Sequence, residues 1–151
     1  MQRPHRITGA LILAVFGLLN LHSAAVIGGE RRSVVSNIAN IRSGPGGNFD
    51  IIWKVEKYHP LLIVEESGNW FRFRDFENDE GWIHRSLLGT VPTIITRQAP
   101  CNIRSGPGTQ NKILFTVDAG IPFRILQTRG NWLQIEHADG DRGWIHQSLV
   151  W

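Results

Sequence analysis

The side chains best suited to chemistry in this sequence are tryptophan, histidine and serine residues that recur at a spacing of 62 positions (132 − 70 = 62). The candidate ligand-binding residues form two matching sets: Trp70, Trp82, His84 and Ser86, then Trp132, Trp144, His146 and Ser148. An indole can stack on a sugar ring or grip a short peptide, and imidazole and hydroxyl groups can hydrogen-bond to either. The alternative is that each tryptophan is simply the largest packing residue available to a small core.

Catalysis and metal binding are both disfavoured by the residue pattern. His84 and His146 each lack a second ligand at a recognisable zinc spacing. No nucleophile motif surrounds the serines, and the single cysteine, Cys101, has no activating neighbour. The sequence therefore predicts no catalytic residue, no metal and no cofactor. A hydrolase would instead need a pocket that brings Cys101 or a histidine together with acidic side chains.

The candidate residues belong to a longer internal repeat. Residues 40–46, Asn-Ile-Arg-Ser-Gly-Pro-Gly, recur as residues 102–108, and Gly-Asn-Trp and Gly-Trp-Ile-His blocks recur at the same offset. A constant offset means that there is no net insertion between the copies, which is typical of a duplicated domain. The Ser-Gly-Pro-Gly segments lack the Lys-Ser/Thr of a phosphate loop and are interpreted as turns. Arg42 and Arg104 are expected to form a local salt bridge or to brace the loop, rather than to contact a ligand.

Short strands separated by turn residues must position these side chains. Apolar and polar residues alternate, so that Phe71 and Phe73, or Leu133 and Ile135, share one face of a strand. By the same alternation, Trp82 and His84 point away from Ile83. About five strands per copy, with no sustained helical period, predict an all-β fold of two small barrels. Barrels this small bury only ~60% of their unfolded surface, so we expect the two copies to dock.

The succession of Asn-Ile-Arg-Ser-Gly-Pro-Gly, Gly-Asn-Trp and Gly-Trp-Ile-His, with Ser-Leu two residues on, resembles the bacterial SH3 (SH3b) domain family. The resemblance occurs twice and implies tandem SH3-like barrels at residues 34–89 and 95–151. Domains of this family are commonly cell-wall targeting or protein-interaction modules. Leu87 and Leu149 replace the groove tyrosine of eukaryotic SH3 domains, so an aromatic-lined groove for proline-rich peptides is not expected.

The N-terminal residues are typical of an export signal. Arg3 and Arg6 precede a short apolar run, and small residues around Ala25 suit cleavage, so residues 1–25 are interpreted as a signal peptide. Residues 26–33 are expected to be a linker. An uncleaved signal/anchor segment is the alternative, and it would provide the only membrane contact. The predicted localisation is periplasmic or secreted.

The charge balance argues against nucleic acid as a partner. Without Arg3 and Arg6, 14 of the 16 basic residues remain against 13 acidic ones, which leaves a net charge of +1. Residues 33–89 hold 6 basic and 8 acidic residues, whereas residues 95–151 hold 6 basic and 4 acidic residues. The net charges of the two segments are therefore opposite in sign. This difference can aid docking of the copies or give them different ligands. Cys101 lies on the face of Ile103, and we interpret it as a buried small apolar residue.

Together, these patterns predict an exported, non-catalytic binding protein with two small β modules. Its expected partner is cell-wall peptidoglycan, through the peptide, or an envelope protein. The alternative is a protein-interaction subunit or regulator of an envelope enzyme. The indoles decide between binding and packing, because only exposed tryptophans can meet a ligand.

Overall fold

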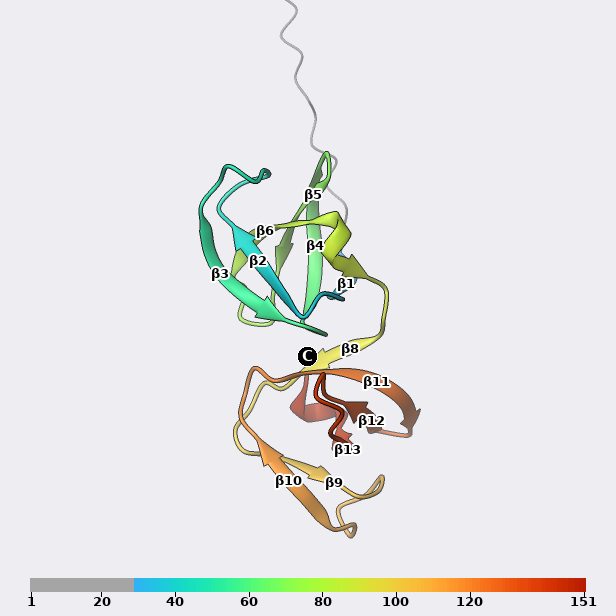
Figure 1. Ribbon diagram of the computed structural model, residues 1–151. Helices are drawn as coiled ribbons and strands as arrows, with labels where there is room; N and C mark the ends of the chain where they lie inside the picture. Colours follow the sequence, from blue (N-terminus) through green and yellow to red (C-terminus); the bar gives the residue numbers. More distant parts are fainter. Residues whose placement is uncertain (1–28) are drawn as a thin grey trace, which may run out of the picture.

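The computed structural model describes residues 29–151, and it is built from β-strands and two single turns of 3-10 helix. Figure 1 shows two β units that adjoin end to end, with strand β8 between them. This confirms the all-β prediction. The predicted signal peptide, residues 1–25, lies outside the described residues. Within residues 29–151, no helix is long and apolar enough to cross a membrane.

The first copy is a seven-stranded antiparallel sheet in the order β3-β2-β6-β5-β4-β1-β7. Strong curvature folds the sheet around one core of apolar side chains, which includes Ile41, Phe73 and Ile83. A 3-10 turn, Arg85–Leu87, follows β6. The strands are β1 (Glu30–Val34), β2 (Ile38–Arg42), β3 (Ile51–Glu56), β4 (Pro60–Ser67), β5 (Trp70–Arg74), β6 (Glu80–His84) and β7 (Leu88–Gly89).

The second copy repeats this arrangement in a six-stranded sheet, in the order β10-β9-β13-β12-β11-β8. Its separate core includes Ile103, Ile135 and Ile145. A second 3-10 turn, Gln147–Leu149, follows β13. The strands are β8 (Thr93–Ile95), β9 (Cys101–Arg104), β10 (Ile113–Val117), β11 (Pro122–Arg129), β12 (Trp132–Glu136) and β13 (Arg142–His146).

Two kinds of glycine explain why the repeated motifs fold in this way. Gly68 and Gly130 begin the hairpin turns and have φ angles of 58° and 55°, a region that side-chain-bearing residues rarely adopt. Gly81 and Gly143 let two strands approach closely, because a Cβ atom at either position would overlap Ile41 or Ile103, respectively. The glycines of the repeat therefore fix both the turns and the packing of the core.

The expected linker at residues 26–33 is wrong for residues 30–33, which form most of strand β1. Arg31 pairs with Leu62 of β4, and Val34, at the end of the strand, is fully buried. Thr93 holds the matching position in β8, because it pairs with Arg124, which lies 62 residues after Leu62. The charged residues gave no sign of the strand in the sequence, since the side chains of Glu30 and Arg31 are exposed.

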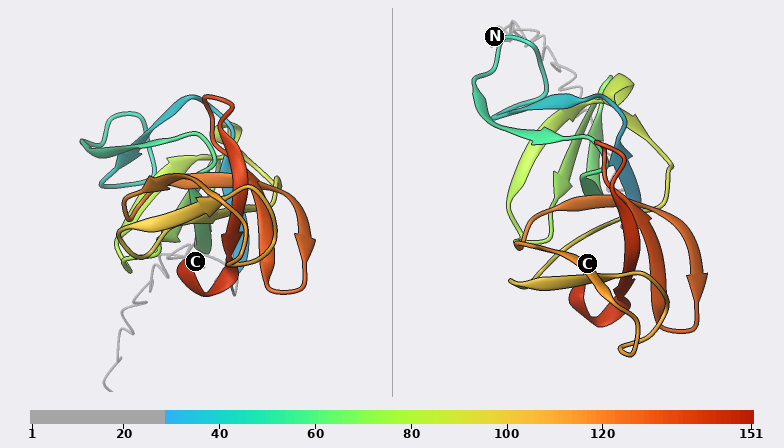
Figure 2. Two further views of the ribbon diagram at one scale, coloured as in Figure 1. Left: turned by 90° about the horizontal axis from the view of Figure 1, so that it is seen from below. Right: turned by 60° about the horizontal axis from the view of Figure 1, so that its bottom comes forward.

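The two copies contact each other. The guanidinium carbon of Arg31 lies 3.9 Å from the centroid of the Trp151 ring, and that of Arg124 lies 5.8 Å from the centroid of the Tyr58 ring. A Cβ atom built on Gly120 would lie 3.7 Å from Phe76 of the first copy. Figure 2 shows the two sheets adjoining in both further views. The docked arrangement agrees with the expectation from the sequence. The rotational correlation times of the two copies in solution test it further.

Candidate functional site

The candidate site is built on the pairing of two neighbouring strands. Trp70 opens β5 and lies directly opposite His84, the last residue of β6. Their rings meet edge to face, with 5.2 Å between centroids and an interplanar angle of 85°. Trp132 and His146 repeat the pair, with 5.2 Å between centroids and an angle of 80°. The alternation within one strand grouped His84 with Trp82, whereas the ring that meets His84 belongs to Trp70 of the neighbouring strand, and Trp132 meets His146 in the same way.

Each histidine is oriented by the serine two residues later. Nδ1 of His84 accepts a hydrogen bond from the backbone N–H of Ser86 at 3.2 Å and lies 2.7 Å from the Ser86 hydroxyl. The corresponding distances between His146 and Ser148 are 3.3 and 2.8 Å. Because Nδ1 accepts the backbone N–H, the neutral ring carries its proton on Nε2. Each copy thus presents an N–H donor on a ring held against an indole.

In the second copy, Trp132, His146 and Ser148 line a hollow of about 300 Å³. It contains three of the four candidate residues of that copy and four residues that were not predicted as ligand contacts. The lining residues are Asn102, Arg104, Thr109, Trp132, His146, Ser148 and Leu149. Asn102 and Arg104 could have been found from the strand alternation, since both point away from the buried Cys101 and Ile103.

The repeated arginines support the wall of this hollow. A terminal nitrogen of Arg104 donates to the backbone carbonyls of Thr109 and Asn111, at 2.8 and 2.9 Å. Arg42 makes the equivalent bond to the carbonyl of Phe49, at 2.7 Å. The predicted loop brace is therefore confirmed. Arg104 also retains a place in the lining of the hollow, so that it both shapes and borders the site.

The tryptophans of β6 and β13 differ from each other. Trp82 is half-buried, whereas Trp144 is only 6% exposed, which corrects the expectation that all four repeated indoles offer surface to a ligand. The guanidinium carbon of Arg129 lies 5.7 Å from the centroid of the Trp144 ring. Ser67 holds the matching position in the first copy and is too short to cover an indole. The packing alternative therefore holds for Trp144.

Beside Trp82, the first copy carries a ladder of ion pairs around Arg72, a position that is neutral in the second copy. Nε of Arg72 donates to Glu65 at 2.6 Å, and a terminal nitrogen donates to Glu80 at 2.7 Å. Hydrogen bonds from Arg74 and Arg72 lower the pKa of Glu80. At the positions of Arg72 and Glu65, the second copy has Gln134 and Gln127, joined by a 2.6 Å hydrogen bond. The two copies therefore differ in charge at these two positions, while elsewhere on the same strands Glu136 of the second copy pairs with Arg124 and Arg142.

The remaining nucleophile candidates have structural roles. Cys101 is fully buried, its Sγ donates to the carbonyl of Gln98 at 3.1 Å, and burial raises the pKa of the thiol. It packs as the predicted small apolar residue. The Ser86 hydroxyl lies within reach of His84, but the same ring nitrogen accepts the backbone N–H that caps the 3-10 turn. This geometry fixes the orientation of the ring.

The model of the bacterial SH3 domain family matches the chain twice, at residues 35–89 and 97–151. The two matched segments together cover well over half of the chain, and each falls within one β unit, with strands β1 and β8 lying just before them. The predicted family resemblance is therefore confirmed.

Comparison with individual proteins gives more distant similarities. A putative N-acetylmuramoyl-L-alanine amidase, YrvJ, of Bacillus subtilis (strain 168) is 21% identical over 161 residues, covering 99% of this chain and 31% of the relative. NlpC2 of Trichomonas vaginalis is 15% identical with a TM-score of 0.37, covering 82% of this chain and 48% of that one. An NlpC/P60 family protein of Bacillus cereus ATCC 10987 is 11% identical with a TM-score of 0.39, covering 81% and 56%, respectively. The chain thus spans about a third of the curated relative and about half of each solved structure.

Proposed function

Since this chain belongs to the bacterial SH3 domain family and carries its domain twice, we propose that it is an exported, non-catalytic protein that binds cell-wall peptidoglycan. The observation that carries the proposal is the repeated pairing of an indole with an oriented imidazole, Trp70 with His84 and Trp132 with His146. The site residues proposed are these four with Trp82, Ser86 and Ser148.

The geometry suits a ligand with an apolar face and a hydrogen-bond acceptor. The indole offers a flat surface for a sugar ring or a peptide plane, and Nε2–H of the adjacent histidine can donate to a carbonyl or carboxylate. The hollow beside Trp132 has a volume of about 300 Å³, which is at the lower end of the range that is typical of small-ligand sites. Peptidoglycan supplies both elements, since it consists of sugars that carry short peptides.

The similarity to a protein named as an N-acetylmuramoyl-L-alanine amidase supports a cell-wall ligand, because that name refers to a bond of the cell wall. The match covers 31% of the relative, so the amidase activity belongs to that protein as a whole. For this chain we infer the binding role alone. Export rests on the signal pattern of residues 1–25, and it places the binding sites in the periplasm or outside the cell.

The experiment is co-sedimentation of the protein with purified peptidoglycan. We expect the protein to pellet with the cell wall in a saturable manner and to release no soluble fragments from it. If the protein stays in solution while crosslinking in cells captures one envelope protein, the role of subunit or regulator of an envelope enzyme replaces peptidoglycan binding.

A further inference from the structure

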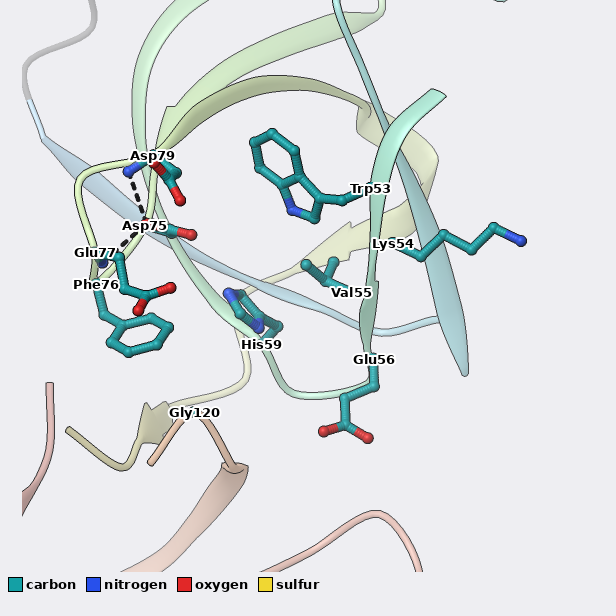
Figure 3. A pocket seen from close by; sticks show the side chains of 10 residues that line it. All are labelled: Trp53, Lys54, Val55, Glu56, His59, Asp75, Phe76, Glu77, Asp79 and Gly120. Carbon is teal, nitrogen blue, oxygen red and sulfur yellow. Dashed lines mark hydrogen bonds between the residues drawn. The ribbon is translucent and has the colours of Figure 1, made fainter. Parts of the chain in front are cut away.

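The first copy contains another hollow, whose lining residues differ chemically from those of the tryptophan and histidine site. It has a volume of about 560 Å³ and lies beside the loop that joins β5 to β6. Asp75, Glu77 and Asp79 supply carboxylates, and Trp53 and Phe76 supply aromatic faces. Figure 3 shows Asp75 and Asp79 on one side of the hollow, with the Trp53 ring across from them and Phe76 below. Trp70 begins β5 and Asp75 follows its end, so the two sites lie at opposite ends of one strand.

The three carboxylates are crowded, since one oxygen of each lies within 4.8 Å of the others. Asp75 is 7% exposed, and one of its oxygens accepts the backbone N–H groups of Glu77 and Asp79, each at 2.9 Å. Among the described residues, no basic side chain forms an ion pair with any of the three. Lys54 borders the hollow but points away from the carboxylates (Figure 3). Inside the described chain, these carboxylates are therefore not neutralised by an ion pair.

His59 gives an independent sign of a ligand. It is 8% exposed and lines the same hollow, and its Nε2 has no hydrogen-bond partner. A buried polar atom without a partner is unfavourable. Burial also lowers the pKa of His59 to about 4, so that the ring is neutral at ordinary pH. With its proton on Nδ1, the ring can accept a hydrogen bond from a ligand N–H at Nε2.

We propose that this hollow binds the cationic side-chain group of a lysine or arginine that belongs to a partner protein or peptide. Carboxylates neutralise such a group, aromatic faces attract it through cation–π contact, and Nε2 of His59 accepts one of its N–H groups. A bare divalent ion would use the carboxylates but would leave the walls of Trp53 and Phe76 without a role. The inference goes beyond the proposed function, because it concerns another surface and another ligand.

The acidic character continues across the junction between the copies. Glu56 lines this hollow and also a hollow of about 520 Å³ in the second copy, which Asp118, Asp139 and Asp141 border. Asp139 and Asp141 match Glu77 and Asp79 in the repeat, although acidic residues are fewer in the second copy overall. The partner that fits this band of carboxylates is a segment with more than one basic residue.

The test is an NMR titration of the full-length protein with the synthetic peptide acetyl-Gly-Lys-Gly-Lys-Gly-amide. We expect shifts of the backbone amides of Phe76, Glu77, Asp79 and Gly120. The double variant E77Q/D79N keeps the side-chain shapes and is expected to bind the peptide at least tenfold more weakly. D50N, an exposed carboxylate outside the hollow, is the matched control and is expected to bind as the wild type does.

Three outcomes would overturn the inference. The first is an absence of shifts at the hollow, and the second is equal binding of the peptide after acetylation of both lysine amines. The third is that CaCl₂ or ZnCl₂ produces the shifts at these residues while the lysine peptide does not. The variant W70A/W132A separates the two sites, because it leaves the carboxylates in place and is expected to keep its affinity for the peptide.

Discussion

Arg31 of the first copy lies over the indole ring of Trp151 of the second, 3.9 Å from its centroid. The contact joins strand β1, whose charged residues do not show a strand pattern, to the segment that follows the 3-10 turn of the other copy. Together with the contact between Arg124 and Tyr58, it holds two small barrels in one arrangement. These contacts also hold the acidic residues of the two copies next to each other, in one continuous band.

The docking of the copies leads to the first prediction. In the wild-type protein, ¹⁵N relaxation is expected to give both copies the same rotational correlation time. R31A removes the cation–π contact, worth roughly 0.5–1 kcal/mol at an exposed position, and is expected to let the correlation times of the copies separate. K112A is the control, since Lys112 is exposed and lies in a loop of the second copy. Different correlation times in the wild type would contradict docking.

A second prediction concerns the glycines at the strand crossings. G81A and G143A are each expected to lower the free energy of unfolding by about 1–3 kcal/mol, because the new methyl group overlaps Ile41 or Ile103. Urea denaturation followed by tryptophan fluorescence measures the change. G47A is the matched control, because a methyl group there meets no atom within 4 Å. A change of less than 0.5 kcal/mol in G81A would show that the strands do not cross so closely.

A third prediction follows from the buried histidine. The pKa of His59 falls from 6.5 to about 4 on burial, so the unfolded chain binds the proton more readily than the folded one. His59 therefore favours unfolding as the pH falls from about 6.5 to 4, with a total loss of about 3 kcal/mol. Above pH 6.5 its contribution is constant.

The variant H59I tests this dependence, since isoleucine occupies the matching position 121 of the second copy. Unfolding free energies of wild type and variant are compared at several pH values between 4 and 7.5. The difference between them is expected to shift in favour of the variant as the pH falls. Parallel curves for the two proteins would show that His59 titrates normally in the folded state.

The sequence predicted much of the fold because the repeat is written in residues with strong local preferences. Gly68 and Gly130 indicate hairpin turns, and the alternation around Phe71 and Leu133 identifies the strand faces that point into the core. Strand β1 was missed, because Arg31 and Arg32 have the composition of a solvated linker and pair with β4 through their backbones. Strand pairing of this kind leaves little trace in side-chain type.

The candidate site was predicted in part for a similar reason. Period-two alternation placed Trp82 and His84 on one face, but it could not tell Trp82 from the buried Trp144, beside which Arg129 lies on another strand. The acidic hollow escaped prediction because His59 joins Asp75, Glu77 and Asp79 only after folding. Local patterns report the face of a strand, whereas covering contacts depend on the tertiary structure.

The most direct test of the central claim is the affinity of the double variant W70A/W132A for soluble peptidoglycan fragments, measured by isothermal titration calorimetry. Each stacking contact is worth about 0.5–1.5 kcal/mol, so loss of the indole is expected to weaken binding at each of the two sites by roughly 2- to 12-fold. I38A, which truncates an apolar side chain that is 64% exposed, is expected to bind as the wild type does. Unchanged affinity in a folded W70A/W132A variant would contradict the account.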